Sequence, residues 1–326
     1  MSERTIFYIF PGQGSQYRGM GSDLVGEFPA ARELYERASK VVGYDVLELS
    51  CTDSREELNL TRFTQPALLT HHVACVESFR SLVGDRVKPR LAGGHSLGEY
   101  TALVAAGALP FEEAVSLVAR RGALMSELGR GGMLATTLEL PAATALADKH
   151  FCGIGGCNLP DQTVVAGEDK DLDALAADMA VTHPGKRGVR LNTEGAFHTY
   201  LMVNAAQRFR EVLEATPFAP PTIDVLSNYT GKLHEPAADA IRSRLFFQLF
   251  NPVRWVGCMN TAIDNRVDTI VEFGGGIGKG EGPESKRPNL ETIVKKSLKW
   301  REHEAEYLPA INVAGIRAAA ERLLAN

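Results

Sequence analysis

Apolar residues in this chain form short continuous runs that alternate with longer segments of helical periodicity. The run at residues 6–10 is rich in β-branched and aromatic residues and ends at Pro11-Gly12, which is typical of a buried strand that leads into a turn. Strands that alternate with helices predict an α/β fold with a mainly parallel sheet. The helical segments of this first part are residues 29–42, 64–83, 98–106 and 111–128.

The pattern changes between residues 129 and 197. Predicted strands at 132–138, 151–157, 162–167 and 187–192 enclose predicted helices at 141–150 and 169–181. This β-α-β-β-α-β order is the ferredoxin-like motif. We therefore expect a small subdomain at residues 129–197, inserted into a larger core of residues 1–128 and 198–326. In that core, helical and strand segments resume at 200–215, 223–227, 237–249, 259–265, 269–273 and 290–298.

Composition narrows the class of protein. With 326 residues, 44% hydrophobic and 23% charged, the chain can bury a full core. Its net charge of −5 argues against a nucleic-acid or membrane-surface binder. No signal peptide and no apolar span of about 20 residues is present. The five cysteines match no zinc or redox spacing, so we expect reduced thiols in a monomeric, cytoplasmic protein.

The segment Gly94-His95-Ser96-Leu97-Gly98 carries the most specific chemistry. It is a G-x-S-x-G sequence between a short apolar stretch at 90–93 and an alanine-rich helical stretch at 100–106, which is the context of a nucleophile elbow. On such a turn the serine hydroxyl projects outward, and the helix N-terminus directs free N–H groups at a developing oxyanion. Ser96 is therefore a candidate covalent nucleophile. The alternative is a small-residue turn without chemistry.

Three segments of the chain form a recognisable set. They are Phe10-Pro11-Gly12-Gln13-Gly14-Ser15-Gln16, Gly94-His95-Ser96-Leu97-Gly98-Glu99-Tyr100 and Gly195-Ala196-Phe197-His198. Together they resemble one family, the malonyl-CoA:acyl carrier protein transacylases and the related acyltransferases of polyketide synthases. The segments occur in the family's order, and supporting stretches at 64–67, 158–167 and 248–255 extend the resemblance from residue 6 to about residue 273. The resemblance implies an α/β-hydrolase-like core with an inserted ferredoxin-like subdomain.

The resemblance also assigns roles to single residues. A serine hydroxyl needs a base, and His198 stands at the family's catalytic histidine. By similarity, a main-chain carbonyl at Gln248 orients this histidine. The backbone N–H groups of Leu97 and Gln13 would form the oxyanion hole, because such donors are fixed before charge appears.

Arg121 is the predicted specificity residue. It lies 25 positions after Ser96, where the family places the arginine that grips a malonyl carboxylate, and a guanidinium matches a carboxylate bidentately. The alternative interpretation is a surface charge at a helix end. Phe197 resembles the malonyl-selecting form of the histidine motif. We expect His95 and Asn158 to contact the substrate as well.

Two departures from the family pattern leave alternatives open. Gly195 replaces a histidine that is usual in polyketide acyltransferases, so it enlarges the pocket or loosens the loop, and an unusual acyl group stays possible. Residues 274–288 replace a direct passage from a Gly-Pro-Gly turn into the closing helix, either as a flexible lid or as a disordered insertion.

The end of this region is basic. From Lys279 to Arg301 there are seven Lys or Arg against three Glu. An acidic carrier protein would dock on such a surface, with Lys295, Lys296 and Lys299 as candidate contacts. A solvated helix face is the alternative.

The sequence therefore predicts an acyltransferase that takes a malonyl group from coenzyme A onto Ser96 and transfers it to the phosphopantetheine thiol of an acyl carrier protein, in polyketide or fatty-acid biosynthesis, with no metal and no cofactor. Three alternatives remain: transfer of an unusual acyl group between carrier proteins, hydrolysis of acylated carriers, and a catalytically idle docking module. Retention of Arg121 argues against the hydrolase, and the pair Ser96 and His198 argues against the docking module.

Overall fold

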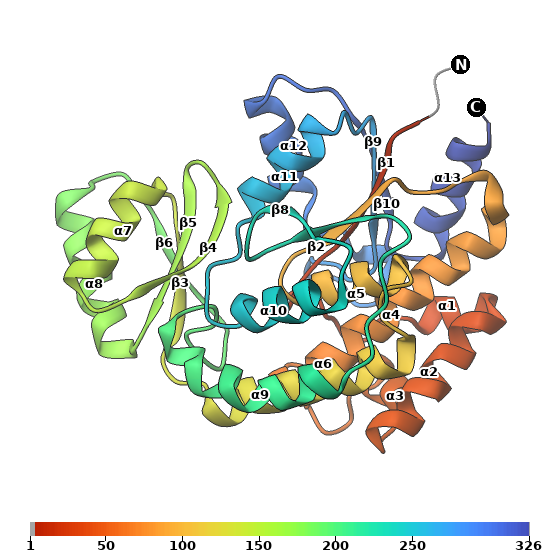
Figure 1. Ribbon diagram of the computed structural model, residues 1–326, viewed down its shortest axis with the longest axis horizontal. Helices are drawn as coiled ribbons and strands as arrows, with labels where there is room; N and C mark the ends of the chain where they lie inside the picture. Colours follow the sequence, from red (N-terminus) through yellow and green to blue (C-terminus); the bar gives the residue numbers. More distant parts are fainter. Residues whose placement is uncertain (1–3, 326) are drawn as a thin grey trace.

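A six-stranded sheet forms the centre of the protein in the computed structural model, which describes residues 4–325 (Figure 1). The strand order is β10-β9-β1-β2-β7-β8, and all neighbours pair in parallel except β8, which runs antiparallel to β7. This confirms the predicted α/β class. The strands are β1 (Ile6–Phe10), β2 (Leu91–Gly94), β7 (Asp224–Ser227), β8 (Lys232–Leu233), β9 (Thr269–Phe273) and β10 (Glu306–Ala310).

Both faces of this sheet are buried, which explains the unbroken apolar run of β1. Ile6, Tyr8 and Phe10 belong to a cluster that includes helices α4, α5 and α6, whereas Phe7 and Ile9 contact a second cluster with α11 and α12. Strands buried on both faces are apolar throughout rather than alternating. These helices are α4 (Thr61–Val83), α5 (Leu97–Ala105), α6 (Phe111–Leu128), α11 (Trp255–Asp264) and α12 (Glu291–Trp300).

Further helices surround this core. None of the described helices is both long and apolar enough to span a membrane. They are α1 (Ser22–Glu27), α2 (Pro29–Val42), α3 (Val46–Cys51), α9 (Val203–Ala215), α10 (Ala238–Gln248) and α13 (Val313–Leu324), with short 3-10 turns at Gly84–Arg86, Tyr200–Met202 and Pro283–Ser285.

A second, antiparallel sheet stands beside the first, at the left of Figure 1. Its order β4-β5-β3-β6 and the chain order β-α-β-β-α-β are those of the ferredoxin-like motif predicted above. Its own core contains Leu134, Val165, Leu146 and Leu172. The division at residues 129 and 197 remains our proposal. The elements are β3 (Gly132–Thr136), α7 (Leu140–Lys149), β4 (Gly153–Leu159), β5 (Gln162–Gly167), α8 (Asp169–Thr182) and β6 (Gly188–Leu191).

Residues 274–288 fold back onto the loop that follows β1. Ile277 and Arg287 exchange two backbone hydrogen bonds of 2.9 and 3.0 Å, and the N–H of Gly276 donates to the carbonyl of Ser15 at 2.7 Å. Gly275 has a positive φ of 64°, and a Cβ there would lie 2.7 Å from the Ser15 hydroxyl. The glycines of this segment therefore permit a turn and a close approach.

Candidate active site

The sharp turn between β2 and α5 places Ser96 just beyond the carboxyl end of strand β2, as the motif predicted. Its φ and ψ of 53° and −102° are rare for a residue with a side chain. Steric crowding allows only glycine at the two flanking positions, Gly94 and Gly98. A Cβ on Gly94 would lie 2.2 Å from the carbonyl carbon of Gly98, and one on Gly98 would lie 2.1 Å from the Phe10 oxygen. The strand, the turn and the helix are thus in direct backbone contact.

Ser96 and His198, 102 residues apart, form a hydrogen bond of 2.8 Å between Oγ and Nε2. The other ring nitrogen of His198, Nδ1, donates to the main-chain carbonyl of Gln248 at 2.8 Å. Burial, and secondly the Arg121 guanidinium, lower the pKa of His198 to about 3. The imidazole is therefore neutral near pH 7, with Nε2 free to accept the serine proton.

Arg121 is a buried cation beside the nucleophile, so its interpretation as a surface charge is wrong. Its Nη2 donates to Ser96 Oγ at 3.2 Å and to Gln248 Oε1 at 3.1 Å, and its Nη1 donates to Gln65 Oε1 at 3.0 Å. Burial lowers the pKa of Arg121. No Asp or Glu of residues 4–325 forms an ion pair with it. A buried guanidinium held only by neutral groups is suited to bind an anion.

The two predicted oxyanion-hole residues, Leu97 and Gln13, come from two different segments that meet at the elbow. Leu97 is the first residue of α5, so its N–H has no partner within the helix. Gln13 lies in the loop after β1, which touches the elbow: a Cβ on Gly12 would lie 2.6 Å from the carbonyl oxygen of His95. Both Leu97 and Gln13 line the same cleft as Ser96.

This cleft has a volume of about 620 Å³ and runs between the two sheets. His95 and Asn158, joined by a hydrogen bond of 2.9 Å, line it together with Phe197. Three cationic side chains, those of Arg121, Arg287 and Lys296, line the cleft, and the described lining contains no Asp or Glu. On a chain with a net charge of −5, such a cleft is electrostatically suited to anionic ligands.

Gly195 permits close packing of the loop that carries His198. A Cβ there would lie 3.1 Å from Gly129 Cα and 3.2 Å from the Phe197 ring. Gly195 is not among the residues that line the cleft, whereas Phe197 is. The glycine therefore makes room for the backbone and the aromatic ring rather than for a larger acyl group.

The three candidate docking lysines occupy different positions on α12. Lys296 lines the cleft, whereas Lys295 forms an ion pair of 2.6 Å with Glu291. Lys299 is exposed near the end of the helix.

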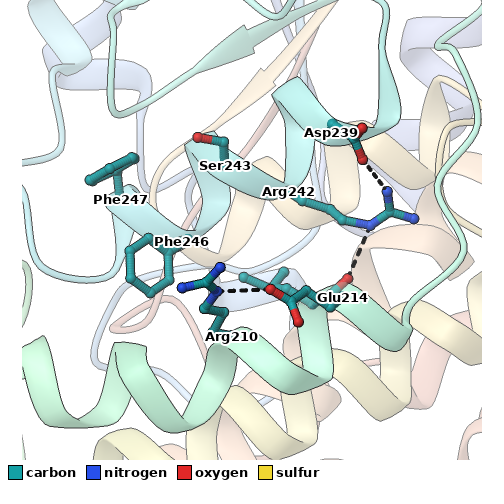
Figure 2. Close-up of a pocket in the computed structure, with 8 residues that line it drawn as sticks. Arg210, Glu214, Asp239, Arg242, Ser243, Phe246 and Phe247 are labelled. Atoms are coloured by element: carbon teal, nitrogen blue, oxygen red, sulfur yellow. Dashed lines mark hydrogen bonds and ion pairs between the residues drawn. The ribbon is translucent and has the colours of Figure 1, made fainter.

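A second hollow, of about 370 Å³, lies between α9 and α10 (Figure 2). Its two arginines are both engaged by carboxylates of their own helices, Arg210 by Glu214 and Arg242 by Asp239, each at 2.8 Å. The charge is balanced there, in contrast to the cleft around Ser96.

Two polar residues beneath the elbow, Asn228 and Glu99, could not be assigned a role from the sequence. Asn228 directly follows β7; its Oδ1 accepts from the N–H of Ser96 at 2.6 Å, and its Nδ2 donates to the carbonyl of Gly94 at 2.8 Å. Glu99 stands within the motif at residues 94–100 and is completely buried. The signal for Asn228 was its place after a buried strand next to β2 in the sheet, but the strand order was not known from the sequence.

The acyl transferase domain family matches residues 7–273 of the chain. The chain therefore belongs to this family. It is 38% identical over 280 residues to the malonyl CoA-acyl carrier protein transacylase of Bacillus subtilis, covering 83% of this chain and 87% of the relative. It is also 38% identical over 254 residues to the polyketide biosynthesis malonyl CoA-acyl carrier protein transacylase PksC of the same organism, covering 77% of this chain and 86% of that protein.

Solved structures agree with the fold. The malonyl CoA-acyl carrier protein transacylase of Coxiella burnetii superimposes with a TM-score of 0.87 at 32% identity, covering 98% of each chain. A malonyl-transacylase solved in complex with a type II PKS acyl-carrier protein has a TM-score of 0.86 at 32% identity, covering 98% of this chain and 99% of that chain. The predicted α/β fold class is thus confirmed.

The lowered pKa of His198 predicts that Ser96 stays reactive in mild acid. The neutral imidazole is the base. For a histidine with an ordinary pKa of about 6.5, the neutral fraction would be about tenfold lower at pH 5.5 than at pH 7.5. We expect the rate of Ser96 labelling by a fluorophosphonate to change by less than about twofold between pH 7.5 and 5.5. Mass spectrometry measures the rate, and His198→Ala is the control for base-dependent labelling. A half-maximal rate near pH 6.5 would contradict the shift.

Proposed function

We propose that this chain is a malonyl CoA-acyl carrier protein transacylase, as its relatives at 36–38% identity are named. It transfers a malonyl group from coenzyme A to the phosphopantetheine thiol of an acyl carrier protein, in fatty-acid or polyketide biosynthesis. The single observation that carries this proposal is the buried Arg121 guanidinium, 3.2 Å from the Ser96 hydroxyl and without a carboxylate partner among the described residues. A carboxylated acyl group supplies that partner.

In the first half-reaction, Ser96 Oγ gives its proton to His198 Nε2 and attacks the thioester carbonyl. The tetrahedral oxyanion accepts hydrogen bonds from the N–H groups of Leu97 and Gln13. Collapse of the intermediate breaks the C–S bond, and the leaving thiolate takes the proton from His198. Throughout, the Gln248 carbonyl holds the Nδ1–H of His198, which keeps Nε2 directed at the reaction.

The second half-reaction reverses these steps with another thiol. The phosphopantetheine thiol gives its proton to His198 and attacks the malonyl-serine, and Ser96 Oγ leaves with that proton. Arg287 and Lys296, farther along the cleft, are suited to face the phosphate groups that both thiol carriers bear. We place the reaction in the cytoplasm, with the support that all five cysteines are free thiols.

Ser96→Ala is the direct test of the nucleophile. We expect intact-protein mass spectrometry after incubation with malonyl-CoA to show one malonyl adduct on the wild-type protein and none on the variant. Because Ser96 Oγ faces the cleft, thermal unfolding of the variant should stay close to that of the wild type. An adduct of the same mass on Ser96→Ala would exclude this serine as the nucleophile.

Arg121→Ala tests the acyl group. Loss of a charge-assisted pair in a buried site is worth roughly 2–5 kcal/mol, so kcat/KM for malonyl-CoA should fall at least about 30-fold more than kcat/KM for acetyl-CoA. Arg120→Ala is the matched control, because its neighbouring side chain is exposed. Equal losses for both substrates would show that Arg121 does not bind the acyl carboxylate.

Charge reversal on α12 tests the carrier-docking face. Lys295→Glu together with Lys299→Glu should slow transfer to the carrier protein by severalfold at low salt, and self-acylation from malonyl-CoA should stay unchanged, because neither lysine lines the cleft. Lys40→Glu, on the exposed side of α2, is the control. If the transfer rates depend neither on these charges nor on salt, α12 is a solvated helix face and not a docking surface.

A further inference from the structure

A buried acidic residue and a buried histidine lie directly beneath the nucleophile turn. Glu99 Oε1 accepts a hydrogen bond from His234 Nε2 at 2.7 Å, and both side chains are fully enclosed. Neither residue takes part in the steps described above. Buried polar groups are costly when they are unpaired, and a fully hydrogen-bonded network of them makes its surroundings rigid.

The second oxygen of Glu99 holds two other residues. Oε2 accepts from the backbone N–H of Asn228 and from the side-chain Nε2 of Gln248, each at 2.9 Å. With three N–H donors around it, Glu99 acts only as an acceptor, which is the behaviour of a carboxylate.

His234, the histidine that binds Glu99 Oε1, has one ring nitrogen outside that hydrogen bond. His234 Nδ1 has no hydrogen-bond partner among the described residues. A proton there would be a buried and unpaired donor, so the geometry favours the neutral ring with its proton on Nε2, where it donates to Glu99.

Glu99 determines which way the amide of Gln248 points. Gln248 Nε2 donates to Glu99 and to the main-chain carbonyl of Ser96 at 3.0 Å, while Gln248 Oε1 accepts from Arg121 Nη2 at 3.1 Å. A flipped amide would set its NH₂ group against the guanidinium and its oxygen against two acceptors. The Gln248 amide thus joins a buried cation to a buried anion, with each end of its dipole facing the opposite charge.

We infer that Glu99 is a positioning residue for substrate selection. It fixes the Gln248 amide, and this amide holds the Arg121 guanidinium where a malonyl carboxylate can bind it; His234 keeps the carboxylate in place. Because the inference concerns selection of the acyl carboxylate, it rests on the proposed function.

The test compares malonyl-CoA with acetyl-CoA in two variants at one position. Glu99→Ala removes the acceptor that orients Gln248, so the ratio of kcat/KM for malonyl-CoA over acetyl-CoA should fall about tenfold or more. Glu99→Gln keeps a carbonyl oxygen for Gln248 and Asn228. It turns an NH₂ group toward His234, whose proton can move to the unpartnered Nδ1. This conservative variant should restore the ratio to within about threefold of the wild type.

Glu272→Ala is the matched control for the loss of a buried carboxylate. Glu272 is fully enclosed on β9 and accepts from the N–H groups of Asn289 and Leu290, not from Gln248 or Arg121. Its loss should lower the thermal unfolding temperature and leave the malonyl-to-acetyl ratio unchanged.

If Glu99→Ala does not fold, Gln248→Leu tests the same link. It removes the amide, keeps the main-chain carbonyl that holds His198, and should show the same fall in the ratio.

The outcomes separate this inference from the proposed function. A wild-type protein that forms no malonyl-serine contradicts the proposed function itself. If the wild type selects malonyl, the inference is overturned by an unchanged ratio in Glu99→Ala or Gln248→Leu, and equally by a Glu99→Gln variant that has lost as much selectivity as Glu99→Ala.

Discussion

The close approach of three backbone segments at the elbow is the constraint on which the candidate site depends. The elbow brings β2 and α5 against the end of β1. The backbones lie so close together that there is no room for a Cβ at Gly94 or Gly98. In this turn Ser96 has a backbone conformation that is rare for a residue with a side chain. Such conformations persist where many surrounding contacts hold them in place. Here the surroundings include Asn228, which binds the N–H of Ser96 and the carbonyl of Gly94.

The electrostatics of the cleft follow from this backbone frame. The frame places Arg121 in contact with Ser96 and Gln248, where almost all of its side chain is buried. Burying an unpaired cation is unfavourable, so its presence indicates that an anion completes the site during function. The same cation adds to the burial effect on His198 and lowers its pKa, so one guanidinium serves both the selection of the acyl group and the protonation state of the base.

Much of this protein could be predicted from the sequence. The bounds of β1, α2, α6, β5 and β9 coincide with the predicted segments, because each is either a short apolar run or a segment of helical periodicity and has a Gly, Pro or Asp boundary. The strand β10 and the helix α13 were missed. Pro309 lies within β10, and a proline normally argues against a strand, but β10 is the last strand of the sheet and an edge strand tolerates it.

The site was predictable where local sequence determines it and hidden where tertiary structure does. Ser96 and Leu97 could be placed from one local motif, and His198 from a family motif 102 positions away. The surroundings of Glu99 could not be predicted, since His234 and Gln248 reach it from segments 135 and 149 residues away, and no local pattern encodes that meeting. Arg287 was likewise hidden, because its place beside the cleft depends on backbone pairing within the segment 274–288 and with the loop after β1.

Selection and chemistry are coupled through Arg121 in the proposed reaction. Burial is the main cause that keeps His198 neutral, and the Arg121 charge adds to it by disfavouring the protonated imidazole. A carboxylate bound to the guanidinium offsets that charge and removes this part of the shift, so His198 becomes a stronger base when the acyl group carries a carboxylate. An acetyl group leaves the cation uncompensated and the base weaker. In the proposed reaction, a carboxylate on the acyl group would therefore assist the proton transfer as well as the binding.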